Sequence, residues 1–366
     1  MRLGVLDVGS NTVHLVVVDA RQGGQPSAMS DWKTTMRLME HINKHGELNS
    51  KGRQKLVKGV KEASDLAETF GCDDMIPFAT SAVRSATNSD DVLAEVKDQT
   101  GVELKILSGE DEARLTFLAV RRWYGWSAGR IIDLDIGGGS LEISAGPDED
   151  PEDAFSVQLG ANRLTHDWLD QDPPSKKKIK ALRDYIDAEL ADPAATIRNH
   201  GIPDLAVGTS KTFRTLARLT GAAPSSAGPR VKRTLTRAGV RQLIAFISRM
   251  TAEDRAELEG VSADRAPQIV AGALVAEGAM RALDLEEISI CPWALREGVI
   301  MRYTDSPVFV ADYPLAGLWL RDAGIRGRRD VGNRLIVGAI WLIYLRVKLV
   351  CGPKMWPYVH CWPALG

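Results

Sequence analysis

The chain has 366 residues, 44% of them hydrophobic, which is long enough for two domains with sizeable cores. Its 46 Lys and Arg nearly balance its 48 Asp and Glu, so the overall charge predicts neither nucleic acid nor an anionic membrane as a partner. Four cysteines, at positions 72, 291, 351 and 361, lack metal-ligand spacing and argue against a disulfide framework. We expect a cytoplasmic protein whose first residues, MRLGVLDVG, form a strand and not a signal peptide.

Strand and helix patterns alternate in the first part of the chain, as in α/β proteins. Two apolar runs around the turn GSNT predict a hairpin at 3–19. The other elements predicted there are a helix at 52–70, strands at 75–83 and 102–107, and a helix at 110–123. We therefore expect a first domain at 1–129.

A second hairpin opens the next predicted domain, 130–306. Its sequence IIDLDIGGGSLEIS (131–144) echoes LGVLDVGSNTVHLV (3–16): aliphatic residues, an aspartate, a glycine two positions later, a small polar turn and a second apolar run. The elements predicted after it are an acidic turn at 147–153, a lysine-rich helix from 176, a strand and glycine turn at 205–212, two or three helices within 236–283, a strand at EISICP and a helix at 294–301.

The tail, 307–366, has a different composition, with tryptophans and an excess of positive residues. Its apolar run LIVGAIWLIYL (335–345) is shorter than the roughly 20 residues that a spanning helix needs. We expect a buried helix or strand here, or a segment unrelated to the rest of the chain, in preference to a membrane span.

The two hairpins have the chemistry of a phosphate site. A glycine turn lets backbone N–H groups approach a phosphate, while the preceding aspartate suits a divalent cation. Either turn alone is more typical of a plain hairpin than of a phosphate site. The matched pair, with a third turn VGTSKT that starts a helix, favours two similar domains facing a cleft. The candidate phosphate-binding residues are Ser10, Asn11 and Thr12, then Gly137, Gly138, Gly139 and Ser140, and then Gly208, Thr209, Ser210 and Lys211.

Six motifs resemble those of the exopolyphosphatase and guanosine pentaphosphate phosphohydrolase (Ppx/GppA) family, within the superfamily of actin, sugar kinases and heat-shock ATPases. They are DVGSNTVHLVV (7–17), ATSAVRSATN (79–88), ILSGEDEARL (106–115), DLDIGGGSLEI (133–143), AVGTSKTF (206–213) and RAPQIVAGALVAEGAMRAL with ALREGVI (265–300). The resemblance covers 1–303 and implies an α/β fold: two actin-like (ribonuclease H-like) domains with mixed sheets flanked by helices and an active site in the interdomain cleft. The tail has no counterpart.

Glu112 is the candidate catalytic base. Within SGEDEARL, Glu110 has Arg114 as an i, i+4 partner, whereas Glu112 has no basic partner at helical spacing. Spacing alone is equally consistent with a solvated carboxylate. The resemblance implies that Glu112 deprotonates the attacking water.

The resemblance also implies a metal site for Mg²⁺ or Mn²⁺. It assigns Asp135 and Glu142 to this site, with Asp7 on the other wall as a weaker candidate. In the first hairpin His14 occupies the place of Glu142. Because no partner at metal-ligand spacing accompanies His14, we expect it to be a packed side chain.

Basic residues supply the remaining candidates. Arg84 follows a predicted strand and is expected to stabilise charge on the transferred phosphoryl group, although pairing with Asp90 or Asp91 explains it equally well without the resemblance. A cluster that could guide a long polyanion contains Arg230, Lys232, Arg233 and Arg237. Solvated helix faces are the alternative explanation for such clusters.

Three functions remain open. The first is an exopolyphosphatase, which releases terminal orthophosphate from inorganic polyphosphate by metal-dependent attack of water. The second is a guanosine pentaphosphate (pppGpp) 5′-phosphohydrolase, and the third is an actin-like nucleotide-binding or kinase-like protein. No evident phosphoryl acceptor lies beside a base, which favours direct attack by water over a phospho-enzyme. The resemblance also suggests a homodimer.

Overall fold

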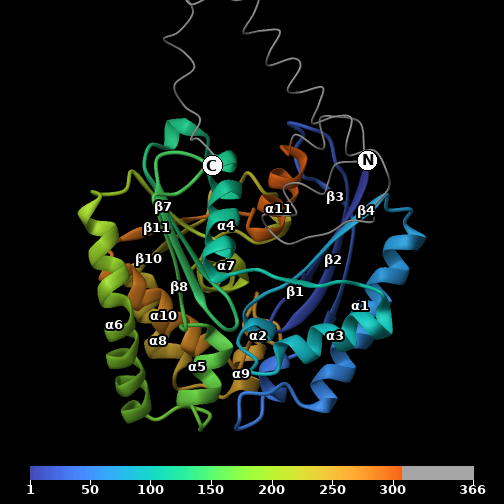
Figure 1. Ribbon diagram of the computed structural model, residues 1–366. Helices are drawn as coiled ribbons and strands as arrows, with labels where there is room; N and C mark the ends of the chain where they lie inside the picture. Colours follow the sequence, from blue (N-terminus) through green and yellow to red (C-terminus); the bar gives the residue numbers. More distant parts are fainter. Residues whose placement is uncertain (307–366) are drawn as a thin grey trace, which may run out of the picture. The chain divides into compact units, whose positions relative to one another are not determined.

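The computed structural model describes residues 1–306, which carry two β-sheets (Figure 1). The first sheet has the strand order β3-β2-β1-β4-β5. Its strands are β1 (Arg2–Val8), β2 (Thr12–Asp19), β3 (Ala28–Thr35), β4 (Asp74–Ala79) and β5 (Lys105–Ile106). Strands β1, β2 and β3 pair antiparallel, whereas β4 joins β1 and β5 in parallel, so the sheet is mixed.

The second sheet has the order β10-β11-β9-β6-β7-β8 and repeats the mixed pattern. Its strands are β6 (Ile131–Ile136), β7 (Leu141–Gly146), β8 (Asp153–Val157), β9 (Leu205–Gly208), β10 (Thr234–Thr236) and β11 (Glu287–Ile290). The hairpin β6–β7 is antiparallel and β9 pairs parallel to β6, as β4 does to β1. The predicted pair of mixed sheets flanked by helices is confirmed.

Helices cover the outer face of each sheet. The first sheet carries α1 (Ser50–Thr69), α2 (Ser81–Arg84), α3 (Ser89–Thr100) and the short helix η1 (Leu38–His41). The second carries α5 (Ala161–Trp168), α6 (Lys176–Asn199), α7 (Ser210–Leu219), α8 (Arg237–Ile247), α9 (Ala252–Ala256) and α10 (Ile269–Ala282). We call these two groups, each with its sheet, the first and second lobes. Two short 3-10 helices, η2 (Trp126–Ala128) and η3 (Ser225–Ala227), lie between other elements.

Two further helices pack against the inner faces of the sheets. Helix α4 (Gly109–Tyr124) lies on the second sheet, where Phe117 and Val120 pack with Ile131. Helix α11 (Leu295–Thr304) lies on the first sheet, where Val299 packs with Val5. The two helices also contact each other. The chain therefore returns to the first sheet at its α11 helix, after building the second.

Strand alternation directs the carboxylates inward. In β6, Ile132, Leu134 and Ile136 enter the core under the outer helices. Because side chains alternate between the faces of a strand, Asp135 points to the face that α4 covers. In β1, Leu3 and Val5 pack toward α11, so Asp7 points to the inner face of the first sheet by the same rule. The alternation thus brings both aspartates toward the space between the sheets.

The structure differs from the predicted elements at several places. Strand β3, strand β8 and helix α3 were not expected; β3 reads AMSDWKTT, with too few apolar residues to signal a strand. The apolar stretch at 75–83 divides into β4 and α2. No helix within 1–306 is long and apolar enough to cross a bilayer. The boundary at 129/130 stays a prediction, and the tail with its run 335–345 lies outside the described residues.

Candidate functional site

One cleft brings together both glycine turns and the four carboxylates singled out in the sequence. The predicted residues that line it are Asp7, Ser10, Asn11, Thr12, Glu112, Asp135, Gly137, Gly138, Ser140, Glu142, Ser210 and Lys211. They come from β1 and its turn, the start of α4, the β6–β7 hairpin and the start of α7. Segments more than a hundred residues apart thus share one site.

The two hairpins present equivalent positions to the cleft. Asp135 lies directly opposite Glu142 across β6 and β7, and Asp7 lies directly opposite His14 across β1 and β2. The sequence echo is therefore a structural repeat in which a histidine replaces one carboxylate. The second hairpin consequently presents one more carboxylate to the cleft than the first.

The two glycine turns approach too closely for larger residues. A Cβ at Gly138 would lie 2.9 Å from the Cβ of Ser10, and one at Gly139 would lie 2.6 Å from the Oγ of Ser81. The Oγ atoms of Ser10 and Ser81 are themselves 2.9 Å apart and hydrogen-bonded. Glycine is required here by contact with the first turn and with the start of α2, in addition to any approach by a phosphate.

The third glycine turn contributes only its last residues to the cleft. Gly208 is buried against Phe213, and Thr209 is fully buried, with its Oγ1 donating to Asp135 Oδ2 at 2.7 Å. Ser210 has a φ of 60°, an uncommon left-handed conformation for a residue other than glycine. This turn directs the first N–H groups of α7 toward the cleft, where the helix dipole favours an anion.

Glu112 occupies the first turn of α4, which begins at Ser108; the Asp111 N–H donates to the Ser108 Oγ at 3.0 Å. The carboxylate is 7% exposed and accepts a hydrogen bond from Arg84, which also donates to the Leu107 carbonyl at 2.8 Å. Glu112 therefore has a basic partner, contrary to what helical spacing indicated. The alternative pairing of Arg84 with the Asp90–Asp91 pair is not what the structure of residues 1–306 shows.

The cleft raises the proton affinity of its carboxylates. Burial raises the pKa of Glu112 to about 7, although the Arg84 guanidinium opposes this rise. Loss of hydration raises the pKa of Asp7 to about 6 and that of Asp135 above its usual range, where the Thr209 hydrogen bond opposes it. Burial and the neighbouring Glu112 raise the pKa of Glu142. Buried carboxylates this close together repel one another, so protonation or a bound cation stabilises them.

A magnesium ion fits this donor set only in part. Within residues 1–306, no three His, Cys, Asp or Glu side chains are grouped closely enough to hold a metal by themselves. Mg²⁺ in proteins commonly takes one or two carboxylates and completes its shell with water and substrate phosphates. Asp135 and Glu142, facing each other across the hairpin, match that requirement.

Several cleft residues were not anticipated as site residues. They are His14, Thr80, Ser81, Thr116, Arg214, Arg265 and Arg296. Arg214 follows Lys211 by three residues on α7, so helical spacing could have found it. Arg265 and Arg296 open the motifs RAPQIVAG and REGVI, but nothing local distinguishes them from surface arginines. His14 contacts Arg296 and lies 3.3 Å from Asp31 through its Nε2.

The unanticipated arginines make one wall of the cleft strongly basic. Partial desolvation, together with the nearby cations Arg265, Lys33 and Arg214, lowers the pKa of Lys211 to about 8. Desolvation and Arg214 lower the pKa of Arg265 to about 10. Cations held together against their mutual repulsion form a site prepared for an anion.

The predicted polyanion cluster does not reach this cleft. Arg230 stacks 5.6 Å from the centre of the Trp123 ring, and Arg237 pairs with Glu286. Arg233 donates to four backbone carbonyls between 223 and 231 and so fixes its own loop. Neither these three arginines nor Lys232 are among the cleft-lining residues.

Comparison with known proteins identifies the family of this chain. The sequence model of the Ppx/GppA phosphatase family matches residues 16–306. The chain belongs to this family. Exopolyphosphatase 1 of Mycobacterium tuberculosis (strain ATCC 25618 / H37Rv) is 67% identical over 306 residues, covering 84% of this chain and 89% of that protein. Exopolyphosphatase 1 of Mycobacterium leprae is 64% identical over the same length, covering 84% and 90%.

Solved structures share the fold. The crystal structure of an exopolyphosphatase from Cytophaga hutchinsonii aligns with a TM-score of 0.74 at 24% identity, over 83% of this chain and 97% of that one. The Aquifex aeolicus Ppx/GppA phosphatase, in its type II variant, aligns with a TM-score of 0.64 at 25% identity, over 82% and 99%. The actin-like fold is therefore shared by this Ppx/GppA chain and its relatives.

Proposed function

We propose that this Ppx/GppA chain is an exopolyphosphatase, which removes the terminal orthophosphate of inorganic polyphosphate. The observation that carries the proposal is the placement of the buried Glu112 in one cleft with two glycine turns and a basic wall. The mycobacterial relatives named exopolyphosphatase 1, at 64% to 67% identity over most of the chain, support it.

In this reaction the glycine turns and Glu112 have different roles. Backbone N–H groups of the turns at Ser10–Thr12 and Gly138–Ser140 suit the terminal phosphoryl oxygens, whereas the Gly137 N–H donates to the Ser140 carbonyl at 2.9 Å. Glu112 accepts a proton from the water whose oxygen attacks the terminal phosphorus. The bond from that phosphorus to the bridging oxygen then breaks, which releases orthophosphate and a chain one unit shorter. Positioning and charge neutralisation supply most of the rate in such reactions.

The basic wall suits the rest of the polyphosphate. Lys211, Arg214 and Arg265 offer charge-assisted hydrogen bonds to the oxygens of the leaving phosphate chain. A magnesium or manganese ion held by Asp135 and Glu142, with Asp7 on the opposite wall, would neutralise phosphoryl charge. Arg84 fixes the Glu112 carboxylate from behind the residues that line the cleft.

The lining of the cleft favours polyphosphate over guanosine pentaphosphate. Among the described residues that line it, no Phe, Tyr or Trp is present on which guanine could stack. The basic wall, in contrast, recognises phosphate oxygens without a base. A cytoplasmic homodimer is part of the proposal through the family resemblance.

The deciding experiment measures magnesium-dependent release of orthophosphate from tripolyphosphate, longer polyphosphate, pppGpp and ATP. We expect release from polyphosphate, with Glu112→Gln lowering kcat by about 100-fold or more. The matched control is Glu110→Gln, two residues away on the same helix, where the exposed carboxylate pairs only with Arg114. A fully active Glu112→Gln variant would overturn the base assignment, and turnover of pppGpp alone would overturn the substrate.

A further inference from the structure

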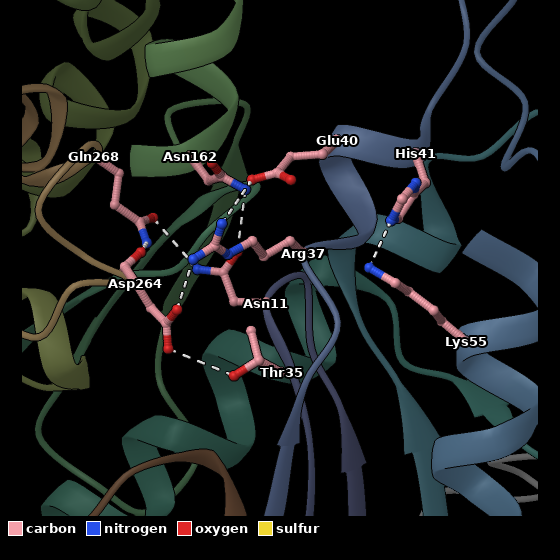
Figure 2. Close-up of polar contacts among 9 residues, drawn as sticks. All are labelled: Asn11, Thr35, Arg37, Glu40, His41, Lys55, Asn162, Asp264 and Gln268. Atoms are coloured by element: carbon pink, nitrogen blue, oxygen red, sulfur yellow. Dashed lines mark hydrogen bonds and ion pairs between the residues drawn. The ribbon is translucent and has the colours of Figure 1, made fainter. Parts of the chain in front are cut away.

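Polar contacts join the two lobes next to the cleft-lining residue Asn11 (Figure 2). Arg37, between β3 and η1 of the first lobe, donates from Nη2 to Asp264 Oδ1 at 2.7 Å. Asp264 lies in the turn between α9 and α10 of the second lobe and also accepts from Thr35 Oγ1 at 3.5 Å. The ion pair therefore spans residues 227 positions apart.

Both arms of this ion pair are attached to phosphate-site residues. The backbone N–H groups of Met36 and Arg37 donate to the Asn11 carbonyl at 2.7 and 3.1 Å, so Arg37 is fixed to the first glycine turn. On the other arm, Asp264 directly precedes Arg265 of the basic wall. A change in the ion pair is thus transmitted to both walls of the cleft.

The Asn11 side chain closes the same network. Its Oδ1 accepts from Asn162 Nδ2 at 3.1 Å, and its Nδ2 donates to Gln268 Oε1 at 3.4 Å. Gln268 in turn donates from Nε2 to the Asp264 carbonyl at 3.2 Å. One short turn, 264–268, consequently carries the acceptor for Arg37, an arginine of the cleft and the partner of Asn11.

We propose that the Arg37–Asp264 ion pair is a positioning clasp, which holds the lobes closed on the phosphate chain and sets Asn11 and Arg265 in place. The clasp rests on the proposed function, because its role is to favour the conformation that binds polyphosphate. Neither residue touches the reacting atoms.

The ion pair of the clasp is weak enough to break when the lobes separate. Its side chains are 42% and 52% exposed, and exposed ion pairs are individually weak. Glu40 of the first lobe lies 3.7 Å from the Arg37 guanidinium through Oε1 and offers a second partner on the same side of the cleft. Arg37 contacts both carboxylates in this structure, Asp264 through Nη2 and Glu40 through Nη1, and can close on Glu40 alone when the lobes separate. Glu40 therefore competes with closure.

This competition predicts opposite effects of two substitutions. Asp264→Asn removes the closing partner and should raise KM for tripolyphosphate about 2- to 5-fold, the change expected when an exposed ion pair biases a closed state. Glu40→Gln removes the competing partner and should leave KM unchanged or lower it. In both variants kcat should stay within about 2-fold of wild type, because a closed complex contains the same reacting groups.

Two further variants test the clasp: one is a matched control, and the other exchanges the two charges of the ion pair. Asp19→Asn removes an acceptor of similar exposure, 54%, that pairs with Arg2 at 3.0 Å within one lobe, and should leave KM unchanged. The exchange Arg37→Asp with Asp264→Arg should restore KM, and Asp suits position 37 because its φ of 50° is left-handed. Thermal unfolding of each variant reports whether it folds.

The possible results test the clasp and the proposed function separately. A wild type that hydrolyses polyphosphate, with KM unchanged in Asp264→Asn, overturns the clasp alone. A wild type without phosphate release overturns the function. In that case the dissociation constant of tripolyphosphate, measured by calorimetry for wild type and Asp264→Asn, still tests closure. An equal KM rise in Asp264→Asn and Asp19→Asn, with no recovery in the exchange, also overturns the clasp.

Discussion

The guanidinium of Arg84 donates a hydrogen bond to the buried carboxylate of Glu112, 28 positions later in the chain. The two residues lie at the ends of different helices, α2 and α4. Burial raises the pKa of Glu112 to about 7, and Arg84 keeps that pKa below what burial alone would give. A general base works best with a pKa near the operating pH, so Arg84 tunes the candidate base.

Removing this partner should shift the pH profile. In Arg84→Gln the pKa of Glu112 rises further, so less of the carboxylate is ionised at pH 7. We expect the ascending limb of kcat against pH to move up by about 1 unit or more, and kcat at neutral pH to fall about 10-fold or more. Arg114→Gln, which removes an exposed i, i+4 partner of Glu110, is the control and should leave the limb in place. If the ascending limb of kcat against pH is the same in Arg84→Gln as in wild type, Arg84 does not tune the pKa of Glu112.

Thr209 should influence the magnesium concentration that is required for activity. Its Oγ1 donates to Asp135 at 2.7 Å and opposes the rise that burial causes in the pKa of that carboxyl. In Thr209→Val the similarly shaped side chain keeps the packing but loses the hydrogen bond. We expect the magnesium concentration for half-maximal activity to rise about 10-fold, as for other partners of metal-binding carboxylates. Thr212→Val, which loses only a 3.0 Å bond to the Ile136 carbonyl, should not raise it.

Lys211 should make polyphosphate binding sensitive to alkaline pH. Desolvation lowers its pKa to about 8, so the ammonium loses its charge as the pH rises through that value. We expect KM for tripolyphosphate to increase about 10-fold above this range, the loss expected for one charged hydrogen bond. An arginine stays protonated, so KM of Lys211→Arg should remain flat over the same range. A wild-type KM that is independent of pH would show that Lys211 does not contact the substrate.

The contact between the second glycine turn and the start of α2 should not tolerate an added methyl group. In Gly139→Ala the new Cβ would lie 2.6 Å from the Oγ of Ser81, the first residue of α2, so the turn must move away from that helix. We expect kcat/KM to fall about 10-fold or more, because small misplacements of site groups are costly. Adding Ser81→Gly removes the obstructing atoms and should recover part of the loss. Equal activity of the single and double variants would indicate that the contact is irrelevant.

The sequence alone determined the repeated part of this protein. The aspartate and glycine pattern at Asp7 and Asp135 predicted two hairpins, and the structure places both in one cleft. Local chemistry suffices for this, because strand alternation and turn preferences act over a few residues. The Ser108 N-cap and the Glu110–Arg114 pair were predictable for the same reason.

Tertiary structure alone decided which charges meet. Arg84 reaches Glu112, and Arg37 reaches Asp264, across separations that no helical or strand period encodes. Arg265 lines the cleft because the turn between α9 and α10 lies beside that cleft. The guanidinium of Arg233, in contrast, is hydrogen-bonded to backbone carbonyls of its own loop. Such pairings depend on how sheets and helices pack, since that packing sets the distances between side chains remote in sequence.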